Sequence, residues 1–119
     1  MKNEATGINR LVTAFGFSIK GLKTAYRYET AFRQEVWAAI ALLPLAFVVG
    51  DGVLEIAILT GSVLLLMIVE LLNTAVENVV DRIGEEFHEL SGRAKDTGSA
   101  AVLLTIVLVA ITWIAIGLK

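Results

Sequence analysis

Three long apolar stretches constrain this 119-residue chain more than any other feature of its sequence. They cover residues 30–49, 53–72 and 100–118. A helix needs about 20 mainly apolar residues to cross a hydrocarbon layer of roughly 30 Å, and each stretch is long enough. Hydrophobic residues make up 56% of the chain, too many for a soluble domain of this size. The sequence therefore predicts a single all-α membrane domain, residues 1–119, with three transmembrane helices.

The positions of the charged residues predict the orientation and exclude other classes of protein. Ten Lys and Arg residues are present, and all except Lys119 precede the first uninterrupted apolar run or lie between the second and third stretches. Basic residues mark the cytoplasmic side of a membrane, so we expect a cytoplasmic N-terminus. No cleavable signal is visible. The net charge of −2 indicates no nucleic-acid partner, and the absence of Cys excludes disulfides and thiolate zinc sites.

The segment before the first stretch, about residues 6–27, has the pattern of an amphipathic surface helix. Its apolar residues recur every three or four positions, and Lys20, Lys23 and Arg27 form a separate basic row. Such a helix lies among lipid headgroups. Gly16 and Gly21 leave open a second interpretation, in which a ligand or another helix approaches the backbone closely.

Acidic residues near the cytoplasmic end of the second stretch are the candidate catalytic groups. Glu70 follows an unbroken apolar run, and a charged group in such a position is a functional candidate. Asn73, Glu77 and Asp81 share one helical stripe with Glu70. Glu70 and Glu77 are separated by about 10 Å along the axis, which suits a general base at the apolar boundary and a separate metal ligand. The plainer alternative is that Glu70 pairs with a cation and only fixes helix packing.

Glu29 and the segment 82–99 complete the polar candidates. Arg33 follows Glu29 by four residues, so a surface ion pair is the plain interpretation. If this segment packs on the second stretch, Glu29 and Glu77 meet at one Mg²⁺ ion. Residues 82–99 predict a cytoplasmic loop, with Asp96, Thr97 or Ser99 as the N-cap of the third span. The segment contains no Gly-rich phosphate-binding motif.

Several runs of this sequence resemble a known family. They are IVELLNTAVENVVDRIG at 68–84, FHELSGRAKD at 87–96 and GSAAV at 98–102, with AFRQE at 31–35 and Trp113. Together they closely resemble the bacterial integral-membrane diacylglycerol kinases over essentially the whole chain. Phe17 and Ile19 depart from the family pattern, in which Tyr and Trp are usual.

The resemblance implies an ATP- and Mg²⁺-dependent kinase that converts diacylglycerol to phosphatidic acid in the bacterial inner membrane. It also implies a homotrimer whose active sites are built from neighbouring chains. Glu70 would be the general base, Asn73 would support the acceptor end, and Glu29 and Glu77 would hold the metal ions. The implied nucleotide contacts are Arg10, Phe17, Glu29, Glu77, Glu86, Phe87, His88, Lys95 and Asp96. The implied lipid contacts are Arg10, Ser18, Ala31, Phe32, Arg33, Gln34, Glu35, Glu70, Ser99 and Trp113.

Three other functions remain open from the sequence. An undecaprenol kinase would use the same chemistry on a polyprenol acceptor. A small oligomeric cation channel or transporter would line its path with Glu70 and Glu77, and would conduct ions without nucleotide. A structural scaffold would tolerate the loss of Glu29, Glu70 and Glu77 together.

Overall fold

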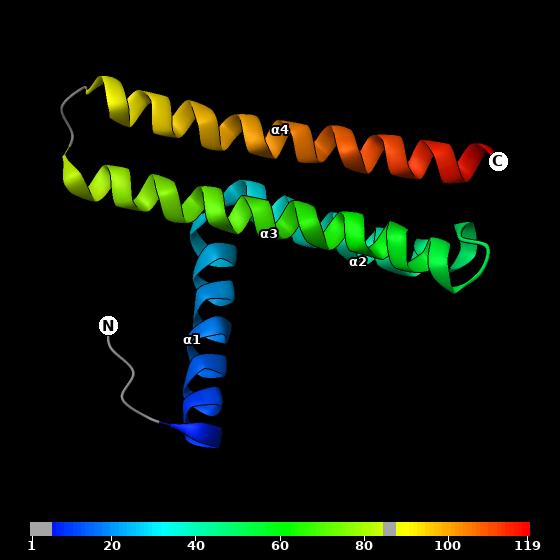
Figure 1. The fold of residues 1–119 in the computed structure, drawn as a ribbon, viewed down its shortest axis with the longest axis horizontal. Helices are drawn as coiled ribbons and strands as arrows, with labels where there is room; N and C mark the ends of the chain where they lie inside the picture. The colour runs from blue at the N-terminus through cyan, green and yellow to red at the C-terminus, as the bar shows by residue number, and fades with distance from the viewer. Residues whose placement is uncertain (1–5, 85–87) are drawn as a thin grey trace.

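The computed structural model of the chain describes residues 6–84 and 88–119 as four helices. In chain order they are α1 (Gly7–Tyr28), α2 (Thr30–Val49), α3 (Val53–Ile83) and α4 (Glu89–Leu118). Figure 1 shows α3 and α4 side by side and antiparallel, with α2 against the other side of α3 and α1 running across their direction. Helices α2, α3 and α4 are each long and apolar enough to cross a membrane. The predicted all-helical class and its three candidate spans are confirmed.

Helix α1 occupies almost the same residues as the predicted surface segment. It ends at Tyr28, and Glu29 alone separates it from α2. The backbone of Glu29 is extended, with φ −112° and ψ 107°, so the helical hydrogen-bond ladder is interrupted at this point. The chain therefore changes direction at Glu29, as Figure 1 shows.

The turn between α2 and α3 is as short as the sequence predicted. Gly52 has a φ of +91°, a backbone conformation that favours glycine. Lys119 forms ion pairs at the same end of the molecule. Its Nζ lies 2.9 Å from Glu55 Oε1 and 3.9 Å from Asp51 Oδ2. These ion pairs connect the end of α4 to the α2–α3 turn.

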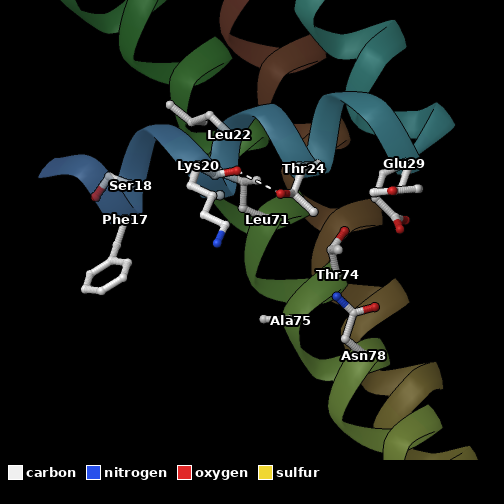
Figure 2. Close-up of a pocket in the computed structure, with 13 residues that line it drawn as sticks. Phe17, Ser18, Lys20, Leu22, Thr24, Glu29, Leu71, Thr74, Ala75 and Asn78 are labelled. Carbon is white, nitrogen blue, oxygen red and sulfur yellow. Dashed lines mark hydrogen bonds between the residues drawn. The ribbon is translucent and has the colours of Figure 1, made fainter. Parts of the chain in front are cut away.

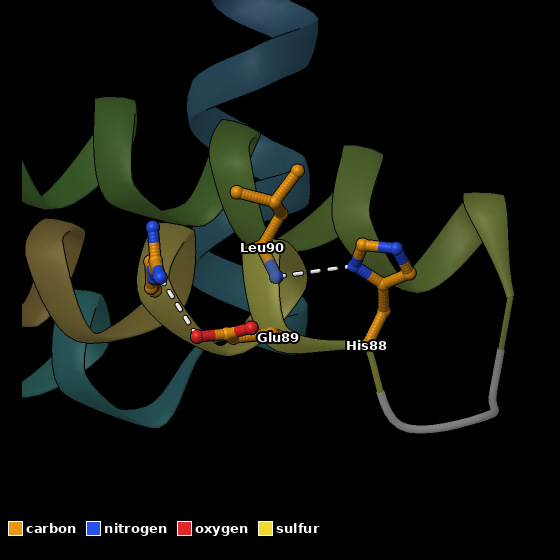
Figure 3. A network of polar contacts seen from close by, with 4 residues as sticks. His88, Glu89 and Leu90 are labelled. Atoms are coloured by element: carbon orange, nitrogen blue, oxygen red, sulfur yellow. Dashed lines mark hydrogen bonds and ion pairs between the residues drawn. The ribbon is translucent and has the colours of Figure 1, made fainter.

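The predicted loop over residues 82–99 is mostly wrong. Helix α3 continues to Ile83, and α4 begins at Glu89. The N-cap of α4 is His88, not Asp96, Thr97 or Ser99: its Nδ1 accepts a hydrogen bond from the Leu90 amide at 3.1 Å (Figure 3). The polar residues and glycines of this segment lower helix propensity only weakly, and packing against α3 overrides that preference. Glu86 and Phe87 lie outside the described residues.

Helices α3 and α4 are longer than the hydrocarbon layer of a membrane is thick. They contain 31 and 30 residues. At 1.5 Å per residue each is about 45 Å long, against a hydrocarbon layer of roughly 30 Å. Few large side chains are fully buried within the chain, Phe32 and Leu59 among them, while many large apolar side chains of α2, α3 and α4 are exposed. Lipid or other protein must cover those surfaces. The C-terminal end of α3 and the N-terminal end of α4 therefore extend beyond the apolar layer, and their polar residues are held on regular helices.

Candidate active site

Glu70 is a buried carboxyl group on α3. Its relative exposure is 7%, and it forms no ion pair within residues 6–84 and 88–119. The interpretation in which Glu70 pairs with a cation is therefore not what the chain adopts. Its neighbour is another acid, Glu35 of α2, whose carboxyl group is close enough to interact electrostatically with that of Glu70. Glu35 Oε1 is buried and has no hydrogen-bond partner in the described structure. Glu35 was expected only as a lipid contact, and its closeness to Glu70 was not predicted.

Two faces of α3 carry polar residues. At 100° per residue, Glu70, Asn73, Glu77 and Asp81 lie along one stripe, as predicted. A second stripe, about a quarter of a turn away, contains Leu71, Thr74, Ala75 and Asn78. We call the first stripe the acidic face and the second the pocket face.

The acidic face is close to Lys95, which lies near the N-terminal end of α4. Lys95 Nζ lies 2.6 Å from Asp81 Oδ1, and Glu77 also interacts electrostatically with Lys95. Lys95 was expected on a loop, but it is held on a regular helix beside α3. Asp81 was predicted on the same stripe as Glu77, but no role was predicted for it. Because both side chains of this ion pair are largely exposed, the pair is open to exchange with another anion.

A pocket of about 890 Å³ lies between α1 and the pocket face of α3. Figure 2 shows Phe17 and Ser18 at one end of it and Glu29, Thr74 and Asn78 at the other. The hydroxyl oxygen of Thr74 is buried and has no partner among the described residues. Thr74 was not among the predicted site residues, although its spacing of four residues from Glu70 places it near the same side of the helix. The pocket is thus apolar along most of its length and oxygen-rich at one end.

Arg33 does not pair with Glu29. Its guanidinium instead donates to the backbone carbonyl oxygens of Tyr26 at 2.6 Å and Arg27 at 3.1 Å, at the C-terminal end of α1. Such contacts satisfy carbonyl groups that have no partner within the helix. The predicted Glu29–Arg33 ion pair is therefore wrong, and the Glu29 carboxylate forms no ion pair within the part of the chain that the structure describes.

The oxygen-bearing side chains near the pocket are of types that bind Mg²⁺, but a single chain does not bring all the predicted ligands together. Glu29, Thr74 and Asn78 offer carboxylate, hydroxyl and amide oxygens, which are the ligand types that Mg²⁺ accepts. Glu29 lines the pocket, whereas Glu77 lies on the acidic face beside Lys95. Across residues 6–84 and 88–119, no three acidic, His or Cys side chains form a group that could hold a metal ion.

The remaining predicted site residues are dispersed over the chain. Arg10, Ala31, Gln34, Asp96 and Ser99 are exposed, whereas Phe32 is buried. His88 forms the α4 N-cap beside the ion pair between Glu89 and Arg93, whose atoms approach to 2.7 Å (Figure 3).

Trp113, predicted to contact lipid, forms a hydrogen bond within the chain. Its Nε1 donates to the Ser62 hydroxyl at 3.2 Å and so connects α4 to α3.

Comparisons with known proteins agree over nearly the whole chain. The sequence model of the family described as "Prokaryotic diacylglycerol kinase" matches residues 16–117. A diacylglycerol kinase of Haemophilus influenzae is 52% identical over 110 residues, covering 92% of this chain and 93% of the relative. Diacylglycerol kinase of Escherichia coli K12 is 51% identical over 113 residues, covering 95% of this chain and 93% of the relative. The corresponding enzyme of Pseudomonas aeruginosa is 43% identical over 111 residues, with 93% and 90% covered.

Proposed function

This chain belongs to the prokaryotic diacylglycerol kinase family, and from that premise we propose that it transfers the γ-phosphoryl group of ATP to diacylglycerol, giving phosphatidic acid. The near full-length similarity to curated diacylglycerol kinases carries the proposal, because it covers the acidic residues of α3 and Lys95 of α4. Phosphoryl transfer depends mainly on positioning and charge neutralisation, which buried acids and nearby cations supply.

Glu70 is the general base of the proposed reaction. Its carboxylate takes the proton from the free hydroxyl of diacylglycerol as the hydroxyl oxygen attacks the γ-phosphorus atom. A bond forms between that oxygen and phosphorus, and the bond from phosphorus to the β–γ bridging oxygen breaks, so that ADP leaves. The burial of Glu70 on an otherwise apolar part of α3 supports this role, since it meets an acceptor that reaches it from the membrane.

The nucleotide end of the proposed site is formed by Glu29, the acidic face of α3 and Lys95 of α4. Glu29 and Glu77 would hold Mg²⁺, which neutralises phosphate charge and orients the nucleotide. Lys95 exchanges Asp81 for a phosphate oxygen when ATP binds, a change that its exposed ion pair permits. The further nucleotide contacts carried over from the family resemblance are Arg10, Phe17, Glu86, Phe87, His88 and Asp96.

The lipid end of the proposed site is the pocket between α1 and α3. Its apolar walls suit acyl chains, and Ser18 lies among them. Glu35 lies near Glu70, and Asn73 follows Glu70 by three residues on α3. We assign both to the acceptor end of the reaction, beside the general base and outside the lining of this pocket. Ala31, Phe32, Arg33, Gln34, Ser99 and Trp113 complete the lipid contacts implied by the family.

We place the complete site in a homotrimer at the cytoplasmic face of the bacterial inner membrane. Glu29 and Glu77 lie on different surfaces of one chain. We therefore propose that Glu29 of one subunit and Glu77 of a neighbouring subunit hold the Mg²⁺ ion together. Helix α1 runs across the direction of the three candidate spans, as a helix lying among lipid headgroups would (Figure 1). The distribution of Lys and Arg supports a cytoplasmic N-terminus.

The decisive experiment supplies purified protein in mixed micelles with radiolabelled ATP, Mg²⁺ and either diacylglycerol or a polyprenol. We expect labelled phosphatidic acid from the first lipid and little product from the second. Preferential labelling of the polyprenol would replace the proposed acceptor. Ion flux through protein-containing liposomes without nucleotide, together with no lipid phosphorylation, would support the channel alternative instead.

Replacing Lys95 by Gln is expected to raise the KM for ATP by about 10–150-fold, because a charge-assisted hydrogen bond contributes about 1.5–3 kcal/mol. The KM for diacylglycerol should change little. Initial rates over a range of ATP concentrations test this prediction. Arg93→Gln is the matched control, since Arg93 lies two residues earlier on α4 and pairs with Glu89. An equal rise in KM in both variants would indicate general electrostatic attraction and not a specific contact.

A further inference from the structure

Gly98 of α4 lies directly against the side chain of Asn73 on α3. A Cβ atom built at Gly98 would overlap Asn73 Oδ1 and would lie 3.3 Å from Asn73 Cγ. Two other helical glycines, Gly61 of α3 and Gly117 of α4, have no atom within 4 Å of such a Cβ. The atoms that crowd a Cβ at Gly98 all belong to Asn73. The close approach is therefore made to one side chain and not to the backbone of α3.

The Asn73 amide occupies this space without a hydrogen bond to hold its oxygen. Oδ1 is buried and has no partner within the described residues. A buried oxygen that accepts no hydrogen bond is not held in place by any polar contact. The room beside Gly98, and not a hydrogen bond to Oδ1, therefore sets the direction in which this oxygen points.

We propose that Gly98 is a positioning residue for phosphoryl transfer, because it provides the space in which the Asn73 amide lies one helical turn from Glu70. This inference rests on the proposed function insofar as Asn73 supports the acceptor end of the reaction. Its geometric part, that Gly98 sets the position of Asn73, does not depend on any activity.

Gly98→Ala is an informative change because its direct local effect on the helix is favourable. Alanine is a better helix former than glycine, so α4 itself is not weakened. The overlapping atom is the far end of a side chain, so rotation of Asn73 relieves the clash without separating α3 from α4. Gly117→Ala is the matched control on the same helix, since its Cβ meets open space.

Kinetics in mixed micelles provide the first test. We expect Gly98→Ala to lower kcat by about 10–100-fold, since small displacements of a site group have effects of that order, with the KM for ATP changed less than about twofold. Gly117→Ala should stay within about twofold of the unsubstituted protein. In an Asn73→Ala background, Gly98→Ala should add less than about a twofold loss, because the overlapping amide is already gone. Equal losses in both backgrounds would overturn the inference.

Nuclear magnetic resonance of ¹⁵N-labelled protein provides a test without activity. The side-chain NH₂ signals of Asn73, identified by their disappearance in Asn73→Ala, should shift in Gly98→Ala and remain in place in Gly117→Ala. Unchanged Asn73 signals in Gly98→Ala would overturn the positioning role. If the unsubstituted protein phosphorylates no diacylglycerol, the proposed function fails, while these signals still decide the geometric part.

A folding defect would also be informative. If Gly98→Ala fails to fold, the double variant Asn73→Ala/Gly98→Ala should recover the thermal stability of Asn73→Ala, because the clash is with a side chain that is no longer present. Failure of the double variant to recover would count against the inference, since some other contact of Gly98 would then be responsible.

Discussion

Glu70→Gln is expected to reduce the rate of diacylglycerol phosphorylation by about 10²–10⁴-fold, the usual contribution of a positioned general base. Gln keeps the size and much of the polarity of Glu but cannot take a proton from the lipid hydroxyl. ATP binding and the oligomeric state should be preserved, because the substitution adds no volume at this buried position. Single-turnover rates with bound ATP measure the chemical step, and nucleotide titration measures binding separately.

Glu55→Gln is the appropriate control for Glu70→Gln. Glu55 lies on the same helix at the opposite end, where it pairs with Lys119 and contacts no proposed site residue. We expect its kcat to remain within about twofold of the unsubstituted value. A Glu70→Gln protein with near-normal turnover would remove Glu70 from the role of base, whatever its ATP affinity.

Glu29→Gln and Glu77→Gln are expected to raise the Mg²⁺ concentration required for half-maximal rate by at least about tenfold. Each change removes a negative charge from a proposed ligand but retains one oxygen donor. The rate should therefore recover partly at high Mg²⁺, whereas Glu70→Gln should not recover at any concentration. Initial rates at fixed ATP and varied free Mg²⁺ separate the two behaviours.

Glu89→Gln serves as the control for the metal titration. Glu89 is an exposed carboxylate that pairs with Arg93 near the same end of the molecule, so its loss changes the local charge without touching a proposed ligand. Its Mg²⁺ requirement should match that of the unsubstituted protein. If the Mg²⁺ requirement rises equally in all three variants, the effect comes from the general loss of negative charge. Glu29 and Glu77 are then not specific ligands.

The membrane-spanning helices were predictable because their hydrophobic signal is strong. The uninterrupted run that ends at Val49 and the short glycine turn after it identify α2 and the start of α3 almost to the residue. The segment 89–99 was not predictable in the same way. Its glycines and charged residues lower helix propensity weakly and resemble those of a loop, and the tertiary contact with α3 overrides that local preference.

The site was predictable to the extent that it follows from helical spacing. The common stripe of Glu70, Asn73 and Glu77 is a property of α3 alone and could be derived from the sequence. The closeness of Glu35 to Glu70, the pairing of Lys95 with Asp81 and the room beside Gly98 could not, because each depends on how two helices meet. The Glu29–Arg33 prediction was wrong because the free carbonyl groups at the end of α1 compete for the guanidinium.

Glu29 is the entire connection between α1 and α2. A longer linker would allow the two helices to take up independent positions in the bilayer, but a linker of one residue is too short for this. An added or deleted residue here would change the span of this extended connection by up to about 3.3–3.6 Å and displace the carboxylate at the same time. The length of the chain at this junction is therefore constrained as tightly as the identity of the residue that forms it.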